Sequence, residues 1–393
     1  MMALEGVRVL DFTQMMLGPW GTQFLGDMGA EVIKIERPKV GEWERGLAAM
    51  GELLHGTSPF FLAMNRNKKS LAVDLKDPRG KEIIYKLAAA ADLVTENFRP
   101  GVLDRLGLGY EDLRRVNPSI VYVAGSGYGP DGPYASRPGQ DLLIQSLSGL
   151  AAQAGRYDDL PTPMATSFVD ASTALLLAFS SMVGLFYRER TGQGQRIDVS
   201  LFNTAIALQC QELAAFMNMD LRWERSRSGI GAPWLSAPFG IYRTQDGYLA
   251  LSMSSLAVVG EILALPALKE YDAPKLAYKH RDTIRPMIQQ KLLSNTTDYW
   301  LARLLARDVW CAEVQDFDDL MTDPQVAHNE LIQTIHHPEA GDIRVIGIPM
   351  KFSGTPGAIR LAPPLVGEHT VEILSQLGYS TAQIEALRQE GVI

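Results

Sequence analysis

Asp170 is the residue whose surroundings most directly suggest chemistry. It precedes the uncharged run Ala171–Tyr187, and the next charge along the chain is Arg188. A carboxylate at the start of an apolar helix can cap it by accepting the unpaired N–H groups of the first turn. The same position can supply a nucleophile, because the helix dipole favours the ionised carboxylate there. The local sequence leaves both interpretations open.

The elements that would position Asp170 are those of a parallel α/β fold. Strands are expected at 6–13, 30–36, 70–75, 92–97, 119–125 and 196–201, and helices at 19–28, 77–90 and 101–116. Strands that alternate with helices of this length form βαβ units. The segment after Tyr128 is rich in Gly and Pro and is expected to be a loop. The uncharged run that follows Asp170 is expected to be a buried core helix rather than a membrane span.

The second half of the chain predicts a separate, smaller unit. A hairpin is expected over 240–253 with its turn at Asp246–Gly247, followed by helices over about 256–325. The C-terminal tail returns to strand and loop, and a capping box at 380–383 begins a last helix.

Composition excludes several classes of protein. A chain of 393 residues is longer than the roughly 250–300 at which single cores stop growing, so two domains are expected. A net charge of −8 argues against a general binder of nucleic acid or anionic membranes. Cys210 and Cys311 are far apart and fit reduced thiols, and the N-terminus lacks a signal-peptide pattern, so a cytoplasmic location is expected. The six histidines form no metal-ligand pattern, so no metal is expected.

A dinucleotide cofactor is not indicated either. The turn after the first expected strand contains Gly18 and Gly21 but no G-x-G-x-x-G, and no phosphate-binding GxxxxGK[ST] occurs. The Rossmann-like layout is retained without the nucleotide chemistry, because a fold does not fix a function.

Eight segments, in order and over essentially the whole chain, carry a family resemblance. They are GVRVLDFTQMMLGPW (6–20), GAEVIKIERP (29–38), NKKSLAVDLKDPRGK (67–81), ADLVTENFRPGVLDRLGLGYEDL (91–113), GYGPDGPYASRPGQDLLIQSLSGL (127–150), VDASTALL (169–176), RTGQGQRIDVSLFNTA (190–205) and PPLVGEHTVEILSQLGYS (363–380). Together they resemble the class III CoA-transferases, the formyl-CoA and carnitine type. The resemblance implies transfer of coenzyme A from an acyl-CoA donor to a free carboxylic acid.

The family's nucleophile is an aspartate, and Asp170 falls on that position. A carboxylate that attacks a thioester gives a mixed anhydride, which keeps enough transfer potential for CoA thiolate to remake a thioester. The resemblance also implies an interlocked homodimer and an α/β fold. Its large Rossmann-like domain would span 1–224 and 326–393, with a smaller α+β domain inserted at 225–325. Coenzyme A would be a substrate, and no tightly bound cofactor is implied.

The resemblance assigns further residues to coenzyme A. They are Gln14, Met15 and Met16 near the thioester, Asn97 and Phe98 along the pantetheine, Arg37 against the adenine, Lys76 and Arg105 near the phosphates, and Val73 close by. Gln140 is a further candidate, expected to donate a hydrogen bond to the acyl or oxyanion site. Each also has a structural interpretation: the cations can be solvated surface charges, and the two methionines can fill a core.

Two alternatives to a transferase remain. The related α-methylacyl-CoA racemases need a second acid/base group, a histidine in the segment R-P-G-x-D, where this chain has Gln140. A glutamine cannot exchange a proton near neutral pH, so the transferase is favoured. A CoA-binding protein without catalytic activity is the other alternative. The loop 225–234 has few glycines, so closure of this loop over the site and the identities of the donor and acceptor acids stay open, although Arg225 and Arg227 could meet a dicarboxylate.

Overall fold

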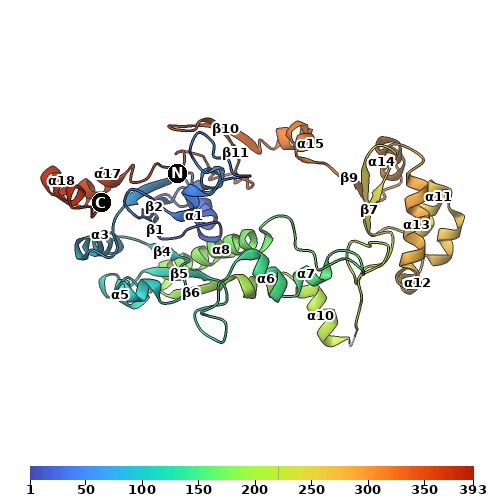
Figure 1. Cartoon of the computed structure of the whole chain (residues 1–393), viewed down its shortest axis with the longest axis horizontal. Coiled ribbons are helices and arrows are strands. Elements are labelled where there is room, and N and C mark those ends of the chain that lie inside the picture. The colour runs from blue at the N-terminus through green and yellow to red at the C-terminus, as the bar shows by residue number, and fades with distance from the viewer. Residues whose placement is uncertain (220) are drawn as a thin grey trace. The chain divides into compact units, whose positions relative to one another are not determined.

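The computed structural model describes residues 1–219 and 221–393, and the chain divides into two compact units (Figure 1). Unit 1 contains Met1–Ile144, Ser167–Ala205 and Pro324–Ile393, and unit 2 contains Gln145–Thr166 and Ile206–Asp323. Each unit has a hydrophobic core of its own. The domain limits expected from the sequence remain a prediction.

Unit 1 is built on a six-stranded sheet. Its strands are β1 (Arg8–Asp11), β2 (Glu31–Glu36), β3 (Lys68–Ala72), β4 (Leu93–Glu96), β5 (Val121–Ser126) and β6 (Arg196–Ser200). They pair in parallel in the order β3-β2-β1-β4-β5-β6, which is the order of a Rossmann fold. The expected parallel α/β sheet is therefore confirmed.

Helices cover both faces of this sheet. The first face carries α3 (Pro78–Ala88), α4 (Val102–Arg105), α5 (Tyr110–Val116), α17 (Thr370–Gln376) and α18 (Thr381–Gln389). Their apolar side chains share one core with the strands. The second face carries α1 (Leu17–Asp27) and α8 (Phe168–Thr191). There a Cβ atom added at Gly184 of α8 would lie 2.6 Å from a Val121 methyl, so glycine permits close packing of helix on sheet.

Some expected elements differ from those in the structure. The single helix expected over 101–116 is two helices, α4 and α5, because Gly107 adopts a φ of +74° and Gly109 caps the second helix. The last helix does begin with the expected capping box, formed by Ser380 and Gln383.

Helix α8 is not the fully buried helix that its composition predicted. Its buried face contains Thr173, Leu177, Ser181 and Gly184. The opposite face exposes large apolar side chains, among them Leu175 (52%), Phe179 (64%), Val183 (47%) and Phe186 (60%). By length and composition alone the helix could cross a membrane, but a third of its most apolar window is buried inside the protein. One face of α8 is thus a core surface and the other an uncovered apolar surface.

The remaining elements of unit 1 are short. They are η1 (Trp43–Gly46), α2 (Pro59–Met64), α6 (Asp141–Leu147), α9 (Leu201–Ala207), α16 (Pro324–His328), β10 (Ile332–His337) and β11 (Gly341–Ile346), of which the last two form an antiparallel pair. Two of these helices, α6 and α9, begin in unit 1 and end in unit 2.

Unit 2 packs helices on a small antiparallel sheet of order β7-β8-β9. Its strands are β7 (Gly240–Arg243), β8 (Tyr248–Leu251) and β9 (Cys311–Glu313), and its helices are α7 (Leu150–Gln153), α10 (Cys210–Asn218), α11 (Leu256–Leu263), η2 (Pro266–Tyr271), α12 (Pro274–Lys279), α13 (Arg281–Leu292), α14 (Thr297–Leu305) and α15 (Phe317–Thr322). Strands β7 and β8 form the hairpin expected at 240–253, in which Arg243 pairs with Tyr248.

Candidate active site

Asp170 lies in the first turn of α8, but it does not cap the helix. The N-cap residue is Ser167, and Asp170 is the third helical residue. The N–H groups of Val169 and Asp170 donate to Oδ2 of Asp141, at 2.8 and 3.0 Å. The capping role considered from the sequence is therefore wrong, because Asp141 supplies the acceptor from a distant part of the chain. The carboxylate of Asp170 is left available for another role.

The protonation of Asp170 also differs from the expectation. Burial, followed by the negative charge of Asp141, raises the pKa of the Asp170 carboxyl to about 7. The helix dipole favours the ionised form, but these two effects outweigh it. Near neutral pH the group is therefore divided between an acid and a carboxylate, which is the range in which a catalytic carboxyl can be tuned.

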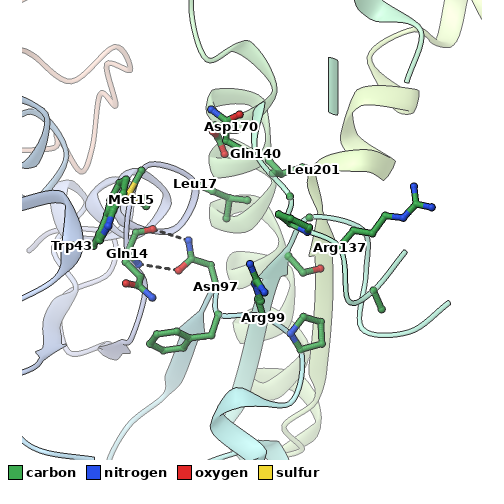
Figure 2. Close-up of a pocket in the computed structure, with 17 residues that line it drawn as sticks. Gln14, Met15, Leu17, Trp43, Asn97, Arg99, Arg137, Gln140, Asp170 and Leu201 are labelled. Carbon is green, nitrogen blue, oxygen red and sulfur yellow. Dashed lines mark hydrogen bonds between the residues drawn. The ribbon is translucent and has the colours of Figure 1, made fainter. Parts of the chain in front are cut away.

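Asp170 opens onto a cavity of about 350 Å³ in unit 1 (Figure 2). Six residues expected at the site line this cavity: Gln14, Met15, Asn97, Phe98, Gln140 and Asp170. The other lining residues are Leu17, Trp43, Arg99, Pro100, Ser126, Gly127, Ala135, Arg137, Pro138, Gly139 and Leu201. In Figure 2, Asp170 and Gln140 are seen at one end of the cavity and Arg99 at the other.

Two glycines bring Gln140 to this cavity. A Cβ atom added at Gly139 would lie 2.3 Å from the Cα atom of Gly127, so the segment before α6 passes directly over the end of β5. Any side chain at either position would push the two backbones apart. The glycine of the R-P-G-Q sequence therefore has a structural reason, and it places the Gln140 amide in the cavity that contains Asp170.

A second cavity, of about 180 Å³, shares Gln14 and Phe98 with the first. It is also lined by Arg37, Val73 and Lys76, which follow the carboxyl ends of β2 and β3. Ligands of open α/β sheets bind beyond these strand ends. The side chains of Arg37 and Lys76 are exposed and form no ion pair with the described residues. These five expected residues therefore lie together along one edge of the sheet.

Met16 and Arg105 are the two expected residues that line neither cavity. Met16 directly precedes α1, and Arg105 ends α4. In contrast, Trp43, Arg99 and Arg137 line the Asp170 cavity although sequence reasoning did not single them out. The signal available for Arg99 was its place directly after Asn97 and Phe98 at a strand end, and Arg137 belongs to the same R-P-G-Q sequence as Gln140.

The loop Thr13–Met15 is held from two sides. The side chain of Asn97 accepts from Gln14 N–H at 2.8 Å and donates to Gln14 C=O at 2.7 Å (Figure 2). Met15 has a φ of +63°, and its N–H donates to the Glu42 carboxylate at 2.9 Å. A non-glycine residue in this conformation is strained and needs such support. These bonds fix the loop whose residues Gln14 and Met15 line the same cavity as Asp170.

Buried charges anchor that loop to the sheet. The ammonium of Lys34 donates to Thr13 C=O at 2.9 Å and pairs with Glu42 at 2.8 Å. Next to it, Lys68 and Asp11 form an ion pair at 3.0 Å, and both side chains are fully buried. Burial alone would raise the pKa of Asp11, but Lys68 and then Lys34 outweigh it and lower the pKa to about 2. Sequence reasoning missed this group.

Glu44 is a further acid near the site. Its side chain is 2% exposed, and its Oε2 atom has no hydrogen-bond partner among residues 1–219 and 221–393. Burial, followed by the charge of Glu42, raises the pKa of Glu44 to about 8, and the charge of Asp170 acts in the same direction. Glu44 is therefore mostly neutral at pH 7, so it adds little negative charge beside Asp170.

The family is decided by comparison with known sequences. The sequence model of CoA-transferase family III matches residues 4–370. This chain belongs to that family. Among its relatives, the succinyl-CoA:glutarate CoA-transferase of Mus musculus is 36% identical, over 100% of this chain and 91% of that protein. The formyl-CoA:oxalate CoA-transferase of Rhodopseudomonas palustris (strain BisA53) is 31% identical, over 100% of this chain and 97% of that protein.

Two solved structures share the fold of this chain. A CAIB/BAIF family protein from Brucella suis superposes with a TM-score of 0.83 at 28% identity, covering 96% of this chain and 99% of that one. The protein Rv3272 of Mycobacterium tuberculosis gives 0.83 at 30% identity, over 95% and 99% of the two chains. The resemblance drawn from the eight segments is thus confirmed. The chain is a CoA-transferase, and CoA thioesters are its substrates.

Proposed function

We propose that the enzyme transfers coenzyme A from an acyl-CoA donor to a free carboxylic acid through covalent intermediates on Asp170. The observation that carries the proposal is the position of Asp170, a carboxyl with a pKa raised to about 7, in a cavity shared with Gln140 and the fixed loop at Gln14. A carboxylate that is neither an ion-pair partner nor a helix cap, and that opens onto a cavity, is suited to nucleophilic attack.

The proposed reaction proceeds in four exchanges. The Asp170 carboxylate attacks the donor thioester carbonyl, so that an aspartyl–acyl anhydride forms and CoA leaves as its thiolate. The thiolate then attacks the aspartyl carbonyl of the anhydride, which gives an aspartyl-CoA thioester and releases the donor acid as its carboxylate. The acceptor carboxylate attacks the aspartyl-CoA thioester and expels CoA thiolate again. Attack of this thiolate on the acceptor acyl carbonyl gives the new acyl-CoA and restores Asp170.

In this proposal the two cavities receive one coenzyme A molecule. Arg37 and Lys76 are exposed cations at the strand ends and suit the adenine and the phosphates. Asn97 and Phe98 would lie along the pantetheine, because Phe98 lines both cavities. The Gln140 amide would donate a hydrogen bond to the oxygen that becomes negative during attack. Contacts of Val73, Met16 and Arg105 with coenzyme A remain predictions.

The racemase alternative is weaker. Racemisation needs a second group that exchanges a proton, and the cavity lining contains Gln140 where that alternative needs a histidine. The relatives named above are transferases that use succinyl-CoA with glutarate or formyl-CoA with oxalate. Their substrate pairs are therefore the first to test.

The experiment follows CoA exchange by mass spectrometry. Purified enzyme is mixed with succinyl-CoA or formyl-CoA and a panel of free acids that includes glutarate and oxalate. We expect new acyl-CoA products, a loss of at least about 1,000-fold in rate for Asp170→Asn, and no loss for Asp131→Asn, an exposed carboxylate in the same unit. Exchange that persists in Asp170→Asn would contradict the proposal. Exchange of the α-proton of a 2-methylacyl-CoA for deuterium from deuterated water, without CoA exchange, would instead favour the racemase.

We further propose a homodimer, and the supporting observation is the exposed apolar face of α8 formed by Leu175, Phe179, Val183 and Phe186. A second copy of the chain would cover this face, whether or not the two chains interlock. Light scattering should give twice the monomer mass of 43.2 kDa. A monomer in solution would contradict the dimer, and binding to lipid vesicles would point to a membrane surface instead. A cytoplasmic location remains a prediction.

A further inference from the structure

A large cavity in unit 2 is lined by two arginines, Arg156 and Arg285, which form no ion pair with any acid in the described part of the chain. It has a volume of about 770 Å³, which is within the range of cavities that hold small molecules. Its floor is the outer face of the three-stranded sheet, where Ile241, Ala250 and Ala312 lie side by side in the strand register. Phe239 and Trp310 complete apolar walls.

The guanidinium groups of Arg156 and Arg285 supply the charge of this cavity. Neither makes an ion pair with a carboxylate of the described residues. Arg285 donates to Ile241 C=O at 2.6 Å, and its Nε–H is buried without an acceptor in the described part of the chain. A guanidinium that lines a cavity and has no carboxylate partner among the described residues favours an anion that enters from the cavity.

The nearby acids are already engaged. Asp282, the carboxylate whose charge acts on Arg285, accepts two bonds from Ser228 at 2.7 Å, from its N–H and from its hydroxyl. Asp159 accepts the backbone N–H of Arg156 at 2.7 Å. Burial lowers the pKa of Arg285, and the positive charge of Arg156 acts in the same direction. The two cations are therefore close enough to repel each other, and a shared anion would relieve that repulsion.

Two glycines leave room for the arginines at the wall. A Cβ atom at Gly229, whose φ is +90°, would lie 3.2 Å from Nε of Arg156, and a Cβ atom at Gly240 would lie 3.7 Å from Nε of Arg285. Both guanidinium groups thus lie against bare backbone on the side of the cavity. The segment 225–234 contributes Gly229 and Gly231 to the lining of this cavity.

The arginines singled out from the sequence have a different role. Arg225 donates to main-chain carbonyls of residues 154–160, among them Ala154 at 2.7 Å and Asp159 at 2.6 Å. The guanidinium of Arg227 lies 3.9 Å from the ring centre of Tyr157. Both therefore support the loop that carries Arg156, and they are not the unpaired charges.

We infer that this cavity binds a small organic acid, with its carboxylate between Arg156 and Arg285 and its carbon chain on the apolar floor at Ile241. The carboxylate would accept hydrogen bonds from the guanidinium groups, and the carbon chain would pack against the apolar walls. Inorganic phosphate offers the same charge without the chain, so it should bind more weakly than the acid. The inference does not depend on the reaction at Asp170.

The test is isothermal titration calorimetry, in which the full chain is titrated separately with hexanoate, adipate, hexan-1-ol and inorganic phosphate. We expect both acids to bind and hexan-1-ol to bind at least tenfold more weakly. Arg156→Gln should weaken hexanoate binding by about 10- to 100-fold. Arg303→Gln, which removes an exposed arginine of unit 2 outside the cavity, is the matched control and should bind as the wild type does.

A second variant keeps both arginines. Ala312→Asp places a carboxylate on the cavity floor at an exposed position, and it should abolish hexanoate binding without loss of thermal stability. Asp170→Asn should retain the binding, which separates this site from the proposed reaction. Equal binding of hexan-1-ol and hexanoate, or unchanged binding in Arg156→Gln, would overturn the inference. Binding of phosphate as tight as that of the acids would assign the arginines to a phosphate group instead.

Discussion

The pocket of Asp170 in unit 1 and the arginine cavity of unit 2 differ in how their charges are compensated. Beneath the loop at Gln14 in unit 1, four buried charges are paired inside the protein, in the ion pairs of Lys34 with Glu42 and of Lys68 with Asp11. In unit 2, Arg156 and Arg285 form no ion pair with a carboxylate of residues 1–219 or 221–393. The paired charges of unit 1 fix the backbone of the loop at Gln14, whereas the two arginines of unit 2 are available to bind a ligand.

Charged residues take on structural or binding roles in this protein according to whether a partner inside the fold compensates them. A fully buried lysine is tolerated only when its ammonium is paired and hydrogen-bonded. Its charge then holds other parts of the protein in place and is not available to a ligand. An arginine at a cavity wall keeps donors free and can still be solvated until a ligand enters. Asp170 lies between these extremes, because it is partly buried and near an acid rather than a base.

The largest effect is expected when the compensation in unit 1 is broken. Lys68→Met leaves the fully buried Asp11 carboxylate without its direct partner, so we expect a loss of about 3–5 kcal/mol in the free energy of unfolding, measured with urea. Lys69→Met, at the neighbouring, partly exposed lysine that pairs with Glu31 and Glu372, should cost less than about 1 kcal/mol. Equal losses in the two variants would show that burial of the pair has no special weight.

A smaller effect is expected when the loop loses one of its supports. Asn97→Ala removes both hydrogen bonds to Gln14. Gln14 then no longer holds the backbone next to Met15, which has a positive φ. We expect kcat/KM for CoA exchange to fall by roughly 10- to 100-fold, because small displacements of positioning groups cost about this much. Thermal unfolding serves as the control for stability. An unchanged kcat/KM would mean that the loop holds its conformation without Asn97.

The mildest test alters only the protonation of Asp170. The carboxylate is the proposed nucleophile and its pKa is about 7, so kcat/KM should fall tenfold per pH unit below that value and level off above it. Asp141→Asn keeps an oxygen acceptor for the N–H groups of α8 but removes the charge that helps raise this pKa. The inflection should therefore move to lower pH. A profile that stays in place would show that Asp141 does not control the ionisation of Asp170.

The sequence was sufficient for the sheet of unit 1 because its signals are local. The strands β1 to β5 are short runs with local sequence signals, and β1, β3 and β4 are each followed by a turn and a helical pattern. The structure places each strand within a few residues of its expected limits. The division between α4 and α5 was also readable, since Gly107 and Gly109 interrupt the pattern, but the expectation of one helix ignored them.

The parts of the site that were missed depend on distant contacts. Asp141 caps α8 across 29 residues of chain to Asp170, so the start of the helix could not be read from its own sequence. The pair of Lys68 and Asp11 joins residues 57 positions apart. A lysine inside a strand signals burial only once the sheet order is known. That Arg156 and Arg285 form no ion pair with the described acids is likewise visible only in the folded structure.

The most direct test of the account is to trap the intermediate on Asp170. Enzyme turning over succinyl-CoA is treated with hydroxylamine, digested, and the peptide that contains Asp170 is weighed by mass spectrometry. Hydroxylamine attacks an activated aspartyl carbonyl, so we expect a hydroxamate on Asp170 that appears only when an acyl-CoA substrate is present. CoA exchange that continues while the Asp170 peptide stays unmodified, or a hydroxamate that forms on another carboxyl, would contradict it.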